Sequence, residues 1–130
     1  MGMRVLLDTH TFLWAVLEPE KLSRKALKLL QNPETQIVLS SVSALEIATR
    51  YRLGRLAHAK SVVQAYGKAV DGLQAEELEV SRAHALKAGL WEVAHRDPFD
   101  RLLAAQADLE GLPLLTNDPA FAQFPIQVWW

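Results

Sequence analysis

The chain has 130 residues, of which 50% are hydrophobic, and its 14 basic and 15 acidic residues leave a formal charge of -1. This length suits a single domain over residues 1–130, and this composition excludes an intrinsically disordered chain and a protein drawn to nucleic acid by its overall charge. Because the chain has no cysteine, disulfide scaffolds, thiolate metal sites and cysteine nucleophiles are excluded as well.

No apolar run approaches the roughly 20 residues that a membrane-spanning helix needs. An acid, Asp8, also interrupts the first residues, where a signal peptide would be apolar. We therefore expect a soluble, cytoplasmic protein that makes no contact with a membrane.

Short apolar runs alternate along the chain with longer stretches of helical spacing. The apolar runs predict strands at residues 4–8, 37–39, 78–80, 112–116 and 126–129. Parallel strands need crossover connections, which helices usually supply. The alternation therefore predicts a three-layer α/β/α sandwich with a mainly parallel sheet of four to five strands.

The predicted helices follow recognisable start signals or apolar faces. Three have expected N-caps: Asp8 for residues 9–16, Ser23 for a helix that ends at Asn32, and Ser43 for one that ends at Gly54. Apolar residues at helical spacing predict further helices around residues 63–73, 86–93 and 99–107.

Acidic residues occur where ligands bind in such a fold, beyond the carboxyl ends of the strands. Asp8 directly follows the first strand, Asp118 follows the fourth, and Glu46 lies on the helix after the second. Asp97 and Asp100 open the helix that leads into the fourth strand. If the sheet is parallel, all of these regions open on one edge, so we expect the acids to surround one shared pocket.

Crowded carboxylates repel one another unless a cation lies among them. Oxygen ligands without thiolate select a hard ion, Mg²⁺ or Mn²⁺. Such an ion would bridge the protein to an anionic substrate, and in-line hydrolysis of a phosphodiester is the reaction that fits best. Glycine-rich phosphate loops, a serine elbow and a paired-histidine zinc motif are all missing from the sequence.

Each acid also has a purely structural interpretation. Asp97 and Asp118 each precede a proline, which is typical of an N-cap followed by proline at the first helical position. Ser43 and Glu46 fit a capping box, and Glu46 is spaced to pair with Arg50. On this interpretation the acids are helix caps and ion pairs without a catalytic role.

The densest basic stretch holds Arg50, Arg52, Arg55, His58 and Lys60. These cations complement the dipole at a helix C-terminus, or they hold an RNA backbone beside the acids; both interpretations stay open.

The sequence resembles the PIN-domain ribonucleases, and among them the VapC-type toxins of bacterial toxin–antitoxin pairs. The resemblance rests on residues 6–10, 40–48, 95–107 and 116–118, and it spans nearly the whole chain. Its most specific part is the Asp-Pro-Phe-Asp-Arg segment at residues 97–101, followed by Gln106-Ala107 and then by a Thr-x-Asp.

The resemblance implies an acidic site made of Asp8, Glu46, Asp100 and Asp118, which hold Mg²⁺ or Mn²⁺ and carry out catalysis. Asp97 would be an outer acid, and Thr116 a polar helper near the metal or its water. The implied activity is endonucleolytic cleavage of RNA by direct attack of water, with 5′-phosphate and 3′-hydroxyl ends. Family members usually form homodimers and are silenced by a small VapB-type antitoxin.

Two other functions remain open at this point. The chain could be a non-catalytic module that binds RNA or a protein partner. It could instead be a PIN nuclease of RNA processing that has no antitoxin.

Overall fold

The protein is described here over residues 2–130 of a computed structural model. A five-stranded sheet forms its centre, with the spatial order β3-β2-β1-β4-β5 and parallel pairing at every step. The strands are β1 (Met3–Leu7), β2 (Thr35–Ser40), β3 (Glu76–Leu78), β4 (Leu114–Leu115) and β5 (Val128–Trp129). The predicted parallel sheet is thus confirmed.

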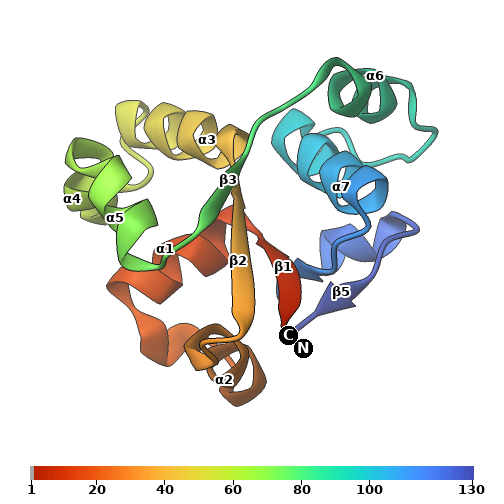
Figure 1. Cartoon of the computed structure of the whole chain (residues 1–130). Coiled ribbons are helices and arrows are strands. Elements are labelled where there is room, and N and C mark those ends of the chain that lie inside the picture. Colours follow the sequence, from red (N-terminus) through yellow and green to blue (C-terminus); the bar gives the residue numbers. More distant parts are fainter. Residues whose placement is uncertain (1) are drawn as a thin grey trace.

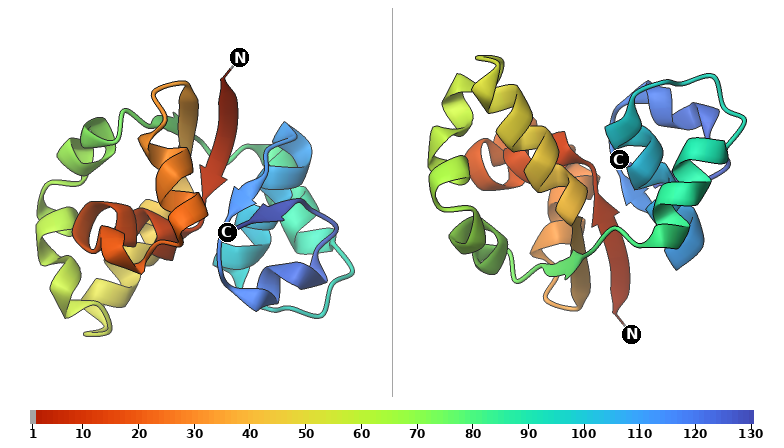
Figure 2. Two further views of the ribbon diagram at one scale, coloured as in Figure 1. Left: turned by 90° about the horizontal axis from the view of Figure 1, so that it is seen from below. Right: turned by 90° about the horizontal axis from the view of Figure 1, so that it is seen from above.

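Helices cover both faces of this sheet, which confirms the three-layer α/β/α architecture (Figure 1). On one face lie α1 (Thr9–Leu17), α2 (Arg24–Gln31), α3 (Ser41–Arg52), α4 (Lys60–Gln64) and α5 (Tyr66–Gly72). On the other face lie α6 (Arg82–Leu90) and α7 (Pro98–Glu110). Three short 3₁₀ helices complete the chain: η1 (Pro19–Lys21), η2 (Ala57–Ala59) and η3 (Pro119–Gln123). Figure 2 shows the same two helical layers from below and from above.

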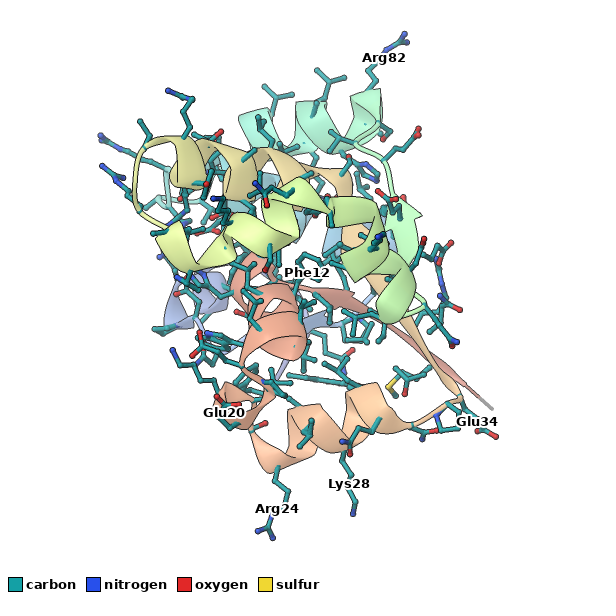
Figure 3. All side chains as sticks on the ribbon, turned by 90° about the vertical axis from the view of Figure 1, so that its left-hand side faces the viewer. Phe12, Glu20, Arg24, Lys28, Glu34 and Arg82 are labelled. Atoms are coloured by element: carbon teal, nitrogen blue, oxygen red, sulfur yellow. The ribbon has the colours of Figure 1, made fainter. Side chains whose placement is uncertain are left out.

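The core has two parts because the central strand β1 is buried on both faces. Val5 and Leu7 belong to the cluster under α1 to α5, and Leu6 belongs to the cluster under α7. A strand buried on both faces has a continuous apolar sequence, which is why β1 was readable from the sequence. Figure 3 shows Phe12 pointing into the first cluster, while Arg24 points away from the molecule.

The order of the strands creates a switch point beside β1. The chain passes from β1 to β2 and β3 on one side, and only later adds β4 and β5 on the other side. At such a point the crossovers on the two sides leave in opposite directions, and ligands of parallel α/β folds bind beyond the carboxyl ends of the two strands. Asp8 follows β1 and Thr116 follows β4, so both lie at the switch point.

The predicted strand at residues 78–80 is wrong by two residues, since β3 covers Glu76–Leu78 and pairs with Val38–Ser40 of β2. This strand forms one edge of the sheet, and its first two residues are exposed glutamates. An edge strand with so little burial has no apolar pattern that marks its register.

The predicted cap at Ser43 is also wrong. Strand β2 leads directly into α3, so Ser40, the last strand residue, is the N-cap, and its hydroxyl accepts the main-chain N–H of Val42 at 3.1 Å. Ser43 lies inside the helix, where its buried hydroxyl is 2.9 Å from that of Thr9 on α1. The predicted capping box with Glu46 is therefore not formed.

Helix α6 exists, but it ends at Leu90 and does not bury the face expected from its leucines. Leu86 and Leu90 are 56% and 77% exposed, because the helix packs on α7 through Ala88 and the buried His84 instead. His84 Nε2 lies 2.9 Å from Glu110 Oε2 of α7. In the described part of the chain, no helix is both long and apolar enough to cross a membrane.

Candidate active site

Asp8 lies at the switch point, directly after β1 and beside β4. Its side chain is only 6% exposed. One carboxylate oxygen accepts the main-chain N–H of His10 at 2.7 Å, which caps α1 as predicted. The other oxygen accepts the hydroxyl of Thr116 at 2.5 Å. A buried carboxylate is thus held at the switch point by one donor from the start of α1 and one from the residue after β4.

The electrostatic state of Asp8 reflects burial and a neighbouring charge. Burial raises the pKa of Asp8 above its ordinary value, and the negative charge of Asp118 raises it further. The Thr116 hydroxyl, the His10 N–H and the charge of His10 oppose this rise in the pKa without cancelling it. The charge of Asp118 thus acts on Asp8, as a smaller effect than burial.

Thr116 joins these two acids. Its hydroxyl oxygen accepts the main-chain N–H of Asp118 at 3.0 Å, and its O–H group donates a hydrogen bond to the carboxylate of Asp8. Asp118 is exposed and is the N-cap of η3, where Oδ1 accepts the N–H of Ala120 at 2.9 Å. Thr116 thus links the buried carboxylate of Asp8 to the main chain of the exposed Asp118.

A second group of acids lies where α3 meets α7. Asp100 stands in the first turn of α7, and its Oδ2 is 2.7 Å from Nε2 of His95. Burial raises the pKa of Asp100 to about 6, and the charges of Asp97 and Glu46 contribute, against the opposing effect of His95. Asp97 also caps α7, accepting the N–H groups of Phe99 and Asp100 at 2.8 and 3.4 Å.

Glu46 is almost fully buried on α3 and forms an ion pair with Arg50 at 2.9 Å, the i,i+4 partner expected from its spacing. Helix α3 packs against both α1 and α7, so it lies between the two groups of acids. The hydroxyl contact between Thr9 and Ser43 ties the start of α1 to α3, next to Asp8.

A comparison of the sequence with models of protein families matches residues 5–127 to the PIN domain. The chain belongs to the PIN domain family. The match covers every acid described above, and the PIN assignment made from residues 6–10, 40–48, 95–107 and 116–118 is thereby confirmed. No curated protein sequence matches this PIN domain.

Solved structures share the fold of this PIN domain at low sequence identity. VapBC2 from Rickettsia felis, bound to a DNA fragment of its promoter, is 20% identical with a TM-score of 0.69, and 98% of each chain is covered. DNA-bound VapBC from Salmonella typhimurium is 21% identical with a TM-score of 0.69, covering 98% of this chain and 97% of the other. A toxin–antitoxin complex from Klebsiella pneumoniae is 18% identical with a TM-score of 0.62, covering 97% and 96%. These likenesses establish the fold.

The acids of this PIN domain fit a hard divalent ion in donor type and in electrostatics. The set is made of carboxylate oxygens, and burial, with a smaller contribution from repulsion between acids, raises the pKa of both Asp8 and Asp100. A dication would remove this repulsion. Among residues 2–130, however, no three His, Asp or Glu side chains lie close enough together to hold a metal ion. Their joint role as metal ligands stays a prediction.

Each of the four carboxylates has a partner within the protein. Thr116 engages Asp8, His95 engages Asp100, Arg50 engages Glu46, and the main chain of η3 engages Asp118. The structure thus brings the acids together as the pair Asp8–Asp118 and the group Asp97–Asp100–Glu46.

Of the basic residues, Arg50 is half-buried against Glu46, whereas Arg52, Arg55 and Lys60 are exposed. Arg50 and Arg52 lie in the last turn of α3, where they complement the helix dipole. The exposed three are free of the core, so the interpretation as an RNA contact stays a prediction.

His95 is a site residue to which the sequence assigned no role. It lies in the segment between α6 and α7, and its contact with Asp100 depends on how that segment folds back onto α7. The signal in the sequence was its place two residues before Asp97, at the start of the segment 95–107 that carries the family resemblance. His10 was missed as well, although its charge acts directly on Asp8.

Proposed function

We propose that this PIN domain is a metal-dependent endoribonuclease that cleaves RNA phosphodiesters. The observation that supports the proposal best is Asp8, a buried carboxylate with a raised pKa at the switch point of the sheet, where the charge of Asp118 also acts on it. Buried, repelling carboxylates are costly to a fold, so they indicate a functional requirement. Family membership adds the expectation of nuclease chemistry.

In this proposal Asp8, Glu46, Asp100 and Asp118 hold Mg²⁺ or Mn²⁺. The bound ion supplies the charge that offsets the phosphate and activates water for attack on phosphorus. Thr116 holds the carboxylate of Asp8 in place, and His95 does the same for Asp100. Arg52, Arg55 and Lys60 contribute positive charge for the RNA backbone.

The proposal includes a protein partner. One structural neighbour is described as a toxin–antitoxin complex, and two others are described as VapBC proteins bound to DNA. We therefore propose that this chain is a VapC-type toxin of the cytoplasm, that a VapB-type antitoxin silences it, and that it acts as a homodimer to inhibit translation.

The activity is tested with purified protein, total RNA, and either Mg²⁺ or Mn²⁺, with a chelator as the metal-free arm. We expect metal-dependent cleavage that leaves 5′-phosphate ends, and we expect Asp8→Asn and Asp100→Asn to abolish it while the protein stays folded. Asp71→Asn, an exposed acid on α5, is the matched control and should cleave normally. Full cleavage by Asp8→Asn, or by wild-type protein in chelator, would refute the proposal.

A second candidate function has its own support in the structure. Asp8, Asp97 and Asp118 all cap helices, and Glu46 forms an ion pair, so each acid has a structural use. A non-catalytic binding module would therefore keep them too. Such a protein would bind RNA with no metal-dependent turnover, and Glu46→Gln would lower stability more than activity.

Coexpression separates the toxin from a PIN nuclease of RNA processing. Growth arrest on expression, relieved by an adjacent small open reading frame, supports the toxin. Harmless expression of a protein that cleaves RNA in vitro supports the processing nuclease instead.

A further inference from the structure

The segment between α6 and α7, residues 91–97, has no regular secondary structure, yet it carries His95, the partner of Asp100. A segment without its own hydrogen-bonded ladder needs other donors for its carbonyl groups. Its conformation therefore depends on contacts from the rest of the fold.

Arg101 supplies these contacts. Its Nε donates to the carbonyl of Ala88 at 2.7 Å, and its Nη1 donates to the carbonyls of Val93 and His95 at 2.8 and 2.7 Å. Its Nη2 donates to the carbonyl of Trp91. One guanidinium thus binds four carbonyls, from the end of α6 through most of the connecting segment.

This geometry requires the planar fork of arginine. A guanidinium presents five N–H donors in a rigid plane, whereas a lysine ammonium is a point charge on a flexible stem. The contacts also direct Arg101 toward the main chain and away from an RNA phosphate, although the residue follows Asp100 directly in the sequence.

The four hydrogen bonds of Arg101, which we call the clamp, are connected to the acidic site through His95. Arg101 holds the main-chain carbonyl of His95, and the imidazole of the same residue contacts Asp100 at 2.7 Å. Only Oδ2 of Asp100 takes part in that contact, so Oδ1 is left for another ligand.

The same segment also touches the part of the chain that carries Asp118. The ring of Trp91 lies 5.3 Å from the ring of Phe124, and the ring of His95 meets Phe124 edge-on at 6.0 Å. Phe124 is buried directly after η3, the helix that Asp118 caps. The clamped segment therefore lies between the helices that begin at Asp97 and at Asp118.

We propose that Arg101 is a positioning residue for the metal site: by holding one carbonyl of α6 and three carbonyls of the α6–α7 connection it places His95 against Asp100, and so orients the Asp100 carboxylate for a divalent ion. The inference rests on the proposed function, because it assigns a purpose to the orientation of Asp100. Groups that hold a metal ligand in place typically contribute roughly 10-fold to 100-fold in metal affinity.

The test measures Mn²⁺ binding to metal-free protein by isothermal titration calorimetry, without RNA. We compare wild type, Arg101→Lys, His95→Ala and the double variant, with Arg82→Lys as the matched control, an exposed arginine at the start of α6. We expect each single variant to bind Mn²⁺ roughly 10-fold or more weakly, and Arg82→Lys to bind as wild type does.

The double variant distinguishes positioning from general stability. If Arg101 acts through His95, adding Arg101→Lys to His95→Ala costs no further affinity, so the two effects are not additive. NMR of the metal-free protein gives a readout that is independent of the ion. The Nε2 resonance of His95 should move in Arg101→Lys toward its position in Asp100→Asn.

Several results would overturn the inference. They are unchanged Mn²⁺ affinity in Arg101→Lys, an unchanged His95 resonance, additive losses in the double variant, or an Arg101→Lys protein that folds under no condition. If wild type binds Mn²⁺ but cleaves no RNA, the proposed function fails and the positioning role is judged on binding alone. If wild type binds no Mn²⁺, both fail.

Discussion

The hydroxyl of Thr116 donates a hydrogen bond of 2.5 Å to the carboxylate of Asp8, and this bond joins two residues that are 108 positions apart in the chain. Both residues are buried, and they directly follow β1 and β4, the two strands that flank the switch point. A buried carboxylate is tolerated only where donors compensate for lost water. Thr116 is therefore a main reason that Asp8 can be charged in this position.

Thr116→Val keeps the shape of the side chain and removes the hydroxyl. We expect the free energy of unfolding to fall by about 1–3 kcal/mol, because Asp8 loses a donor and the N–H of Asp118 loses its acceptor. RNA cleavage should fall as well, since Asp8 is no longer held. Urea unfolding and a single-turnover cleavage assay measure the two effects. Thr49→Val in the middle of α3 is the control, and equal behaviour of the two variants would contradict the role of Thr116.

The stability of the metal-free protein should depend on pH through Asp100. Its pKa rises from 3.8 in the unfolded chain to about 6 in the fold, and its side chain is 16% exposed. The folded state then holds the proton more tightly, so this stabilisation is complete below pH 4 and is lost as the pH rises through 6. The loss is about 3 kcal/mol at most. Asp8 is shifted in the same direction.

The measurement compares urea unfolding of wild type and Asp100→Asn from pH 4 to pH 7. The difference between the two proteins isolates the titration of Asp100 from that of other groups. We expect wild type to lose stability relative to Asp100→Asn across this range. A difference that stays flat, or one of opposite sign, would contradict the raised pKa.

Divalent ions should stabilise the folded protein at pH 7, because they relieve the repulsion between Asp8 and Asp118 and around Asp100. A ligand that binds only the native state at 100 times its Kd adds about 2.7 kcal/mol. We expect Mn²⁺ to raise the Tm, a chelator to reverse the rise, and Asp8→Asn to show little of it. A Tm that does not change when Mn²⁺ is added would support the non-catalytic alternative.

Charge reversal in the basic stretch tests its contact with RNA. Arg52→Glu and Arg55→Glu should weaken binding of a single-stranded RNA, and the dependence of log K on log salt should become shallower by roughly 0.7 per lost phosphate contact. The assay uses the Asp8→Asn background so that the RNA stays intact. Arg24→Glu, on α2 and pointing away from the molecule (Figure 3), is the matched control. Equal salt slopes for all proteins would restrict Arg52 and Arg55 to structural roles.

Features that depend on a few neighbouring residues were predicted from the sequence. The apolar run of β1, the caps at Asp8, Ser23 and Asp97, and the i,i+4 pair of Glu46 with Arg50 all occur as expected. In each case the interacting groups lie within about one helical turn or one strand, so the local sequence contains both partners.

Features that depend on contacts between different helices and strands were not predicted. The register of β3 depends on its pairing with β2, and the cap of α3 moved to Ser40 because β2 runs straight into the helix. Leu86 and Leu90 are exposed because α6 turns His84 and Ala88 toward α7. The strand register, the helix cap and the buried face of α6 cannot be predicted from the apolar periodicity of the segment itself.

The sequence by itself determined a parallel α/β fold of the PIN family and the set of acids that follow its strands. Only the tertiary structure decided which groups hold those acids: Thr116 for Asp8, His95 for Asp100, and Arg101 for the segment that carries His95. Strand ends and helix caps arise from local chemistry, whereas the state of a buried carboxylate depends on donors and charges that long stretches of chain bring to it.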